Sequence, residues 1–136
     1  MCMSEEKIIK IAWLCIRDRR VLFARSYGKE LFYTVGGKPE NGETDTGTLC
    51  REVEEEASVR LILDSIEYLN TFQSQADGKA QGVHVEIRCY QADFIGTLLP
   101  ANEIEELAWF SSCDMHRTTP TGKLVLDWLK SQGYID

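Results

Sequence analysis

Residues 37–59 read GKPENGETDTGTLCREVEEEASV, and they are the most informative stretch of the chain. It opens with a glycine-rich, turn-forming segment and continues into residues that favour an α-helix over positions 45–57, with Thr44 or Asp45 placed to cap it. Because an α-helix turns by ~100° per residue, three acids of this helix fall within an arc of about 100°. The carboxylates on this shared face are Glu52, Glu55 and Glu56.

The clustering of acids on one helix face is compatible with either a cation site or a solvated surface. Like charges three and four positions apart repel, and each such pair destabilises an isolated helix by about 0.2–0.5 kcal/mol. Magnesium reverses the sign of this effect, because it takes oxygen ligands and binds through a few carboxylates together with substrate phosphates. A bare glutamate-rich helix is more often a solvated surface, so the decision between the two depends on the residues around it.

Apolar runs on either side of this stretch predict strands, at residues 8–16, 21–25, 31–35, 66–72, 83–90 and at the end of residues 103–110. The first two should form a hairpin through residues 17–20, and the fourth and fifth should pair antiparallel. A second helix over residues 121–132, closed by Gly133, should cover the sheet. With no repeat or linker visible, we expect a single α/β domain over residues 1–136, with one mixed sheet and helices packed on it.

The composition limits the classes of function. With 43% hydrophobic and 27% charged residues the chain has the composition of a soluble domain, and no apolar run approaches a membrane span. The net charge is -7 and the acids cluster between Glu40 and Glu56, so a long nucleic acid would be repelled. A small phosphorylated ligand that arrives with metal ions is still allowed, whereas a membrane partner is not expected.

The cysteines favour a reducing compartment. The chain has five of them, an odd number, with no CxxC pair and no zinc-type spacing. The first residues are acidic where a signal peptide needs basic ones. We therefore expect the protein in the cytoplasm.

The stretch resembles the signature of the Nudix family. That signature is Gly, five residues, Glu, seven residues, then Arg-Glu-aliphatic-any-Glu-Glu-any-Gly-aliphatic. Eight of its nine specified positions agree, at Gly37, Glu43, Arg51, Glu52, Val53, Glu55, Glu56 and Val59. The hairpin before the stretch, the Gly-Gly entry and the downstream acidic segment ending in Trp109 are also similar to the family, so the resemblance covers most of the chain.

One position departs from the signature, because Ser58 stands where the family has glycine. That glycine follows the helix, where a left-handed backbone is often needed, and another residue there costs about 1 to 2 kcal/mol. Ser58 therefore concerns stability or helix register more than chemistry, although it leaves room for a member that binds without cutting.

The resemblance implies a fold and an activity. The fold is the Nudix α/β/α sandwich with a mixed sheet, and the activity is metal-dependent hydrolysis of a diphosphate linkage in a nucleoside diphosphate-X substrate. The compact length is similar to that of the MutT-like branch, so a (deoxy)nucleoside triphosphate giving nucleoside monophosphate and pyrophosphate is the expected reaction. The implied cofactor is Mg²⁺, with Mn²⁺ as a substitute, and the implied partner is a small nucleotide.

Two other functions stay open at this point. An ADP-ribose or sugar-nucleotide diphosphatase would carry the same signature. A catalytically weak nucleotide-binding sensor would keep the fold and lose turnover, but its catalytic acids should then have changed, and here they are intact. The sequence is silent on the natural substrate and on the number of metals, and it leaves a homodimer open.

The resemblance also assigns roles to the acids and to their support. Glu52, Glu55 and Glu56 match the acids that hold the divalent metal, and Glu52 is also a candidate to orient or deprotonate the attacking water. The backbone carbonyl of Gly36 matches a further metal ligand. A second group of catalytic residues, Arg51 and Glu43, matches a pair behind the metal face, where a charged hydrogen bond would aim Glu52.

Family members often supply one more acid from a downstream loop, and here Glu103 is the expected metal ligand, with Glu105, Glu106 and Glu86 as competitors. For substrate binding we expect cations near the Gly-Gly turn to neutralise phosphate oxygens. The expected substrate-binding residues are Lys38, Arg25 and Gly37, and either Phe32 or Tyr33 is placed to stack on a base.

Overall fold

The computed structural model describes residues 6–75 and 82–136. The predicted loop that contains Asp77 and Gly78 lies outside the described residues. A seven-stranded sheet has the order β2-β3-β4-β1-β7-β6, with β9 added beside β3. Its strands are β1 (Glu6–Trp13), β2 (Ile16–Arg17), β3 (Arg20–Ser26), β4 (Tyr33–Gly37), β6 (Glu67–Gln75), β7 (Val83–Gln91) and β9 (Ile104–Phe110).

The sheet is mixed. Strands β1 and β7 run parallel, whereas the other registered neighbours in this sheet run antiparallel. A small second sheet joins β5 (Arg60–Leu61) to β8 (Phe94–Ile95). Two α-helices, α1 (Asp45–Ala57) and α2 (Pro120–Ser131), and two short 3₁₀ helices, η1 (Leu63–Ser65) and η2 (Ser112–Arg117), complete the described elements.

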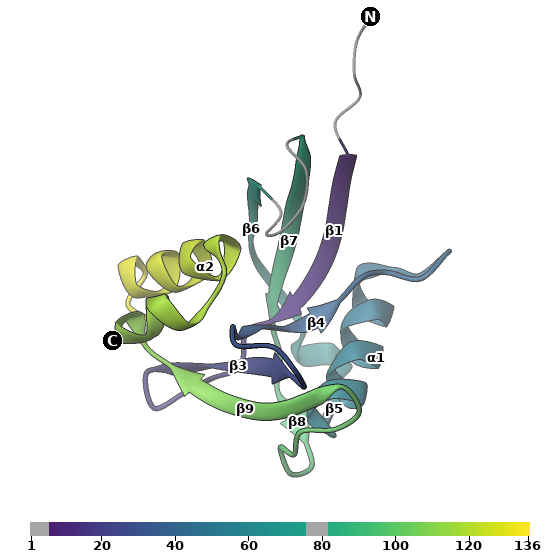
Figure 1. Ribbon diagram of the computed structural model, residues 1–136. Helices are drawn as coiled ribbons and strands as arrows, with labels where there is room; N and C mark the ends of the chain where they lie inside the picture. The colour runs from purple at the N-terminus through teal and green to yellow at the C-terminus, as the bar shows by residue number, and fades with distance from the viewer. Residues whose placement is uncertain (1–5, 76–81) are drawn as a thin grey trace, which may run out of the picture.

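Helices α1 and α2 cover opposite faces of the sheet (Figure 1). Alternate side chains of a strand point to opposite faces, and β1 divides its apolar residues accordingly. Ile11 and Trp13 belong to a buried cluster with Leu49, Val53 and Ala57 of α1. The other cluster joins the second face of β1 to α2, through Ala12, Leu14, Val125, Leu126 and Leu129. The predicted α/β/α sandwich is therefore confirmed.

The predicted first hairpin is partly wrong. The apolar run at residues 8–16 does not form one strand, because β1 ends at Trp13 and pairs with β4 and β7 instead of β3. Only the two-residue β2 forms a hairpin with β3, around Asp18 and Arg19. Both turn residues have positive φ, 51° and 60°, as a type I′ turn requires. An apolar run shows burial, but it does not show where a strand changes partners.

The remaining elements follow the sequence more closely. Strands β6 and β7 pair antiparallel as predicted. Helix α1 has the predicted bounds, and the side chain of Thr44 caps it. Strand β4 lies two residues later than expected and includes both glycines of the Gly36-Gly37 turn, because Gly36 pairs with Ala12 and Gly37 with Ile11. Within the described residues, no helix has the length and apolarity needed to cross a membrane.

Candidate active site

Helix α1 is fixed by a capped N-terminus and by an apolar face packed on the sheet. The hydroxyl of Thr44 accepts a hydrogen bond of 3.1 Å from the Gly47 N–H and so satisfies one of the free donors of the first turn. At positions four apart, Leu49, Val53 and Ala57 are fully buried against the sheet. With this stripe fixed, the helix presents its acids beside β4.

The two glycines of β4 allow the backbone to approach both β1 and the acids. Gly36 has a φ of +144°, and a Cβ built on it would lie 1.9 Å from the carbonyl oxygen of Ile11. A Cβ on Gly37 would lie 2.4 Å from Cδ of Glu52. The Gly36 N–H donates a 2.8 Å hydrogen bond to Oε1 of Glu56. Glycine is therefore a steric requirement at Gly36, whereas a side chain at Gly37 would displace the Glu52 carboxylate.

Glu56 is the most buried of the three acids. Its exposed fraction is only 8%, and burial raises its pKa to about 8, with the charges of Glu52 and Glu103 acting in the same direction. The hydrogen bond from Gly36 and the charge of Lys10 oppose this rise without cancelling it. Burial also raises the pKa of Glu52. The metal-free site therefore disfavours the charged form of these carboxyls, because water solvates them poorly there.

Arg51 and Glu43 form the predicted pair behind these acids. Nε of Arg51 donates to Oε2 of Glu43 at 2.8 Å, and Nη2 donates to Oε1 at 2.9 Å, which is a two-pronged charged contact. Hydrogen bonds from Arg51, from the Glu40 N–H and from the Thr48 hydroxyl lower the pKa of Glu43 to about 2. Glu43 therefore stays ionised and fixes the guanidinium.

The same guanidinium connects the loop to the acid face. Nη1 of Arg51 donates to Oε1 of Glu52 at 2.9 Å, and Nη2 donates to the carbonyl oxygen of Lys38 at 3.1 Å. Two weaker contacts of 3.5 Å reach the exposed carboxylate of Glu55. Arg51 thus holds one oxygen of Glu52 in place and ties the residues after β4 to the helix.

Ser58 adopts the left-handed conformation that the signature glycine would supply, with φ 67° and ψ 19°. Its N–H donates to the carbonyl of Glu54, and its hydroxyl donates to the carbonyl of Leu99 at 2.8 Å. The expected left-handed end of the helix is confirmed. The side-chain hydrogen bond offsets part of the cost of a non-glycine residue there.

The four downstream acids are placed in different surroundings. Glu103 lies close enough to the acid face for its charge to act on Glu52 and Glu56. The neighbouring Asn102 has its side-chain N–H bonded to the carbonyl of Glu55 at 2.7 Å, which ties this segment to α1. Of the candidates, Glu103 is the one that the structure brings to the acid face.

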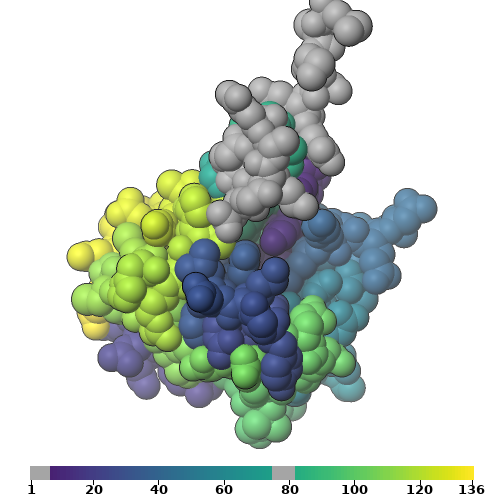
Figure 2. Space-filling model, in the orientation of Figure 1, coloured from purple at the N-terminus to yellow at the C-terminus, as the bar shows by residue number. Residues whose placement is uncertain are grey.

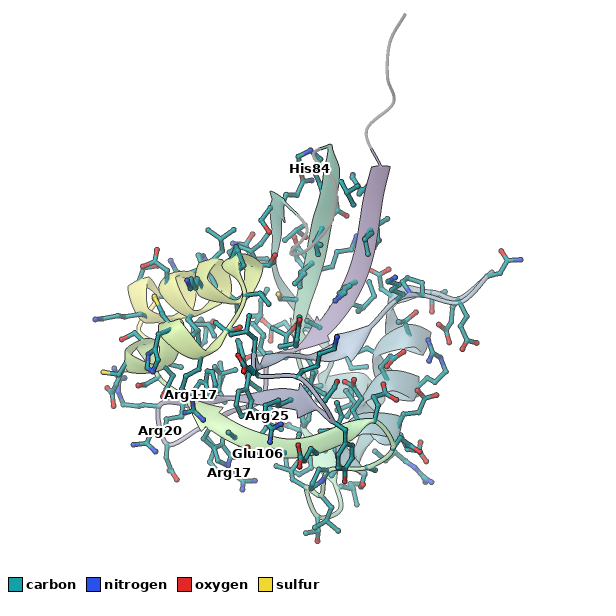
Figure 3. All side chains as sticks on the ribbon, in the orientation of Figure 1. Arg17, Arg20, Arg25, His84, Glu106 and Arg117 are labelled. Carbon is teal, nitrogen blue, oxygen red and sulfur yellow. The ribbon has the colours of Figure 1, made fainter. Side chains whose placement is uncertain are left out.

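The other three acids have structural partners. Glu105 and Glu106 on β9 form ion pairs of 2.7 and 3.2 Å with Arg25 on β3, and Figure 3 shows Arg25 and Glu106 together on these strands. Buried Glu86 pairs with Lys7 at 3.0 Å and with Arg88 at 2.8 Å. Arg25 was expected near Gly36 and Gly37, but the structure does not place its guanidinium there. Strand β3 pairs with β9, and the guanidinium binds the two acids of that strand.

A polar network that the sequence did not reveal fixes the first residue of α1. Arg88 and Tyr90 on β7 bind the Asp45 carboxylate, at 3.1 and 2.7 Å. Arg88 also binds Glu86, so the network joins the start of the helix to the central strands. The alternation of polar residues along β7 could have pointed to a polar face of this strand. It could not have identified Asp45 as the partner, because Asp45 is distant in sequence.

A pocket of about 320 Å³ opens beside Glu56, within the range of small-molecule sites. Its wall includes apolar side chains from β1 and β7. Residues at the start of α2 also line it, together with Gly36, Gly37 and Lys38. Tyr33 also lines the pocket, whereas Phe32 is buried in the core against Phe110. Figure 2 shows this face of the molecule, where the dark-blue residues that follow β3 lie between α2 and the loop before α1.

Lys10 is a pocket residue that the sequence analysis missed. It lies on β1 among apolar neighbours, and burial lowers its pKa, with Lys38 lowering it further. Its alternation with Ile8 and Ala12 places it on the α2 face, where the pattern calls for an apolar residue. A single lysine in a core-facing position of an apolar strand was the signal that could have found it.

The acids do not form a closed cation cage. Across residues 6–75 and 82–136, no three His, Cys, Asp or Glu side chains gather closely enough to hold a metal ion by themselves. Magnesium does not require such a cage, since it keeps several waters and binds through one or two carboxylates plus substrate phosphates. Burial, with the charges of Glu52 and Glu103, raises the pKa of Glu56, and a divalent cation at the acid face would oppose that rise by favouring the ionised carboxylate.

Comparison with known proteins shows the family and the fold of the chain. The NUDIX domain model matches residues 9–129. The E. coli ORF135 protein in solution has a TM-score of 0.74 at 26% identity, covering 98% of this chain and 97% of that one. The MutT NUDIX hydrolase from Burkholderia pseudomallei has a TM-score of 0.71 at 22% identity, covering 90% and 98%.

A third solved structure, the MutT protein from Methanosarcina mazei Go1, has a TM-score of 0.75 at 13% identity, covering 97% and 99%. At such low identity the Burkholderia and Methanosarcina proteins are evidence for the fold alone. No curated protein matches the chain significantly. Because the family model spans most of the sequence, the chain belongs to the Nudix family and is a pyrophosphohydrolase that acts on nucleoside diphosphate derivatives.

Proposed function

We propose that this protein hydrolyses (deoxy)nucleoside triphosphates to nucleoside monophosphate and pyrophosphate with Mg²⁺. The observation that carries the proposal is the position of the acid face of α1 directly beside Gly36 and Gly37 of β4 and beside the pocket. A substrate could place its nucleoside in the pocket and its phosphates at the acids. The protein would act as one domain in the cytoplasm, as its length and its cysteines suggest.

Glu55 and Glu56 are the proposed principal metal ligands, with Glu52, Glu103 and the Gly36 carbonyl completing the set and with Mn²⁺ as a substitute ion. The donor chemistry supports this assignment, because all of these groups offer oxygen, and a cation would stabilise the ionised form of Glu56 that burial alone disfavours. A bound divalent ion supplies neutralisation of phosphate charge and a lowered pKa for water.

Glu52 is the proposed residue that orients the attacking water and accepts its proton. Arg51 holds Oε1 of Glu52, and the backbone of Gly37 packs against the carboxylate. The group is thus restrained on two sides, which is what a positioned base needs. Arg51 and Glu43 are the proposed positioning residues, since they act through Glu52.

Lys38 and Gly37 are the proposed substrate contacts at the mouth of the pocket. The backbone of Lys38 is fixed by Arg51 while its side chain is exposed, so its ammonium is available to a phosphate oxygen. Tyr33 in the pocket wall is the proposed aromatic contact for the base. Arg25 is not part of this proposal, because Glu105 and Glu106 hold it on the β9 side.

The test is release of pyrophosphate or phosphate from a panel of nucleoside triphosphates, ADP-ribose, sugar nucleotides and dinucleotides, with Mg²⁺ and with chelator. Glu55→Gln should abolish turnover. Glu54→Gln is the matched control, because it removes an exposed charge from the opposite side of the same helix. Pyrophosphate from triphosphates supports the proposed substrate class.

Other outcomes would overturn parts of the proposal. Turnover confined to ADP-ribose or sugar nucleotides would replace the substrate class and keep the site. Metal-dependent binding without turnover across the panel would favour a nucleotide sensor. Turnover that survives Glu55→Gln would remove Glu55 from the proposed principal metal ligands.

A further inference from the structure

Lys10 presents its ammonium group to the pocket. Its side chain is half-buried and lines the pocket, and Nζ lies 5.4 Å from the centre of the Tyr33 ring. Counting only partners from residues 6–75 and 82–136, this ammonium makes no hydrogen bond and no ion pair. An ammonium taken partly out of water without such a partner is costly, so the position favours a ligand that supplies acceptors.

A second lysine lies beside Lys10. Strand β4 ends at Gly37, which pairs with Ile11, and the next residue, Lys38, lines the same pocket as Lys10 and lies close enough for its charge to act on Lys10. Two like charges this close repel each other. An anionic group between the two ammonium groups would remove this repulsion, which is a second reason to place an anion there.

The position of Lys10 also indicates which part of a substrate would reach it. On one side, the charge of Lys10 interacts with Glu56 of the acid face. On the other side the pocket wall is apolar, with Ile8, Val85 and Ile87, and suits a nucleoside. Lys10 therefore lies at the transition from the acid face to the nucleoside part of the pocket.

We propose that Lys10 is a substrate-binding residue whose ammonium donates a hydrogen bond to a non-bridging oxygen of the phosphate attached to the nucleoside. This inference rests on the proposed function, because it takes the pocket as the place of the nucleoside. Together with Lys38, which follows β4, Lys10 would bind the phosphate that stays with the nucleoside monophosphate product. The signature does not include this residue.

Binding of product in chelator tests the inference without turnover. NMR titrations would compare adenosine, guanosine, cytidine and uridine with their 5′-monophosphates, for the wild type and Lys10→Met. For the monophosphate that binds most tightly, Lys10→Met should weaken affinity about tenfold, since a charge-assisted hydrogen bond is lost. Affinity for the matching nucleoside should change less than about twofold, and Lys10→Arg should recover part of the loss.

Lys123→Met is the matched control, because it removes the same charge from an exposed position on α2 outside the pocket wall. It should leave both affinities within about twofold of the wild type. Lys10→Met should fold at least as stably as the wild type, since it removes a half-buried charge beside Lys38. An unchanged thermal midpoint would exclude unfolding as the cause of weaker binding.

Equal weakening of nucleoside and monophosphate would overturn the inference in favour of a packing role, and so would unchanged affinity for both. A wild type that binds no monophosphate would overturn it as well. Failure of the hydrolysis panel is a separate result, because phosphate-selective binding through Lys10 is measured without metal and without turnover.

Discussion

Gly37 faces the carboxylate of Glu52 so closely that a Cβ on Gly37 would lie 2.4 Å from Cδ and 2.6 and 2.7 Å from its two oxygens. Gly36, its neighbour, has a different constraint, because a Cβ there would lie 1.9 Å from the backbone carbonyl of Ile11. The first conflict can be relieved by moving the end of a side chain, whereas the second requires a shift of the central strand.

Alanine substitutions should separate the two constraints. Gly37→Ala should displace the Glu52 carboxylate and lower kcat by about 10- to 100-fold, since misplacement of about 1 Å can cost that much. Its unfolding free energy should change by less than about 1 kcal/mol. Gly36→Ala should destabilise the fold by on the order of 3 kcal/mol, from overpacking and an unfavourable φ. Urea unfolding and steady-state kinetics measure both effects, and a fully active Gly37→Ala would contradict the assigned role of Glu52.

The Arg51–Glu43 contact should behave as one unit. Arg51→Lys removes the two-pronged contact with Glu43 and the hold on Glu52, so kcat should fall by about 10- to 100-fold. Glu43→Gln should have a similar effect, and the double variant should lose little more than either single variant. Arg60→Lys, at an exposed position on β5, is the control. Multiplicative losses in the double variant would show that the two residues act independently.

The sequence predicted helix α1 and its neighbours well because the information there is local. Thr44 marks the start of the helix, the apolar positions four apart mark its buried face, and the acids share the remaining face. The Arg51–Glu43 contact joins residues only eight apart. Such contacts are fixed once the helix and its preceding loop form, so a linear pattern is enough to predict them.

Contacts between distant strands could not be predicted in the same way. Arg25 was expected near the Gly-Gly turn, but its partners depend on β9 lying beside β3. Lys10 became a pocket residue because β1 lies between β4 and β7, a pairing that the apolar pattern does not specify. Glu103 was favoured among several acids, and only the fold distinguishes its surroundings from those of Glu86.

Substitution of Ser58 tests how the helix end tolerates a residue other than glycine. Ser58→Gly relieves a left-handed non-glycine residue, which costs about 1 to 2 kcal/mol, but it loses the hydrogen bond to the Leu99 carbonyl, worth about 0.5–1.5 kcal/mol. Stability should therefore change by less than about 1 kcal/mol. Ser58→Ala keeps the strain and loses the bond, so it should be less stable by about 1 kcal/mol. Both variants should keep wild-type kcat, and a large loss in either would give Ser58 a role in the chemistry.

Glu56 should make the metal-free protein less stable as the pH rises. Its pKa is raised from 4.5 to about 8 in the folded state, so between these values the folded protein holds a proton that the unfolded chain has released. The free energy of unfolding then falls with increasing pH across this window and levels off above it.

Urea unfolding in chelator, from about pH 5 to about pH 9, should show this fall in the wild type and in Glu54→Gln, and a smaller one in Glu56→Gln. A divalent ion that binds the Glu56 carboxylate must displace the proton, so Mg²⁺ affinity should rise with pH up to about 8. Calorimetry in buffers of different ionisation enthalpy would detect the released proton. If Glu56→Gln keeps the full wild-type pH dependence, another group holds the proton and the protonation of Glu56 does not govern metal binding.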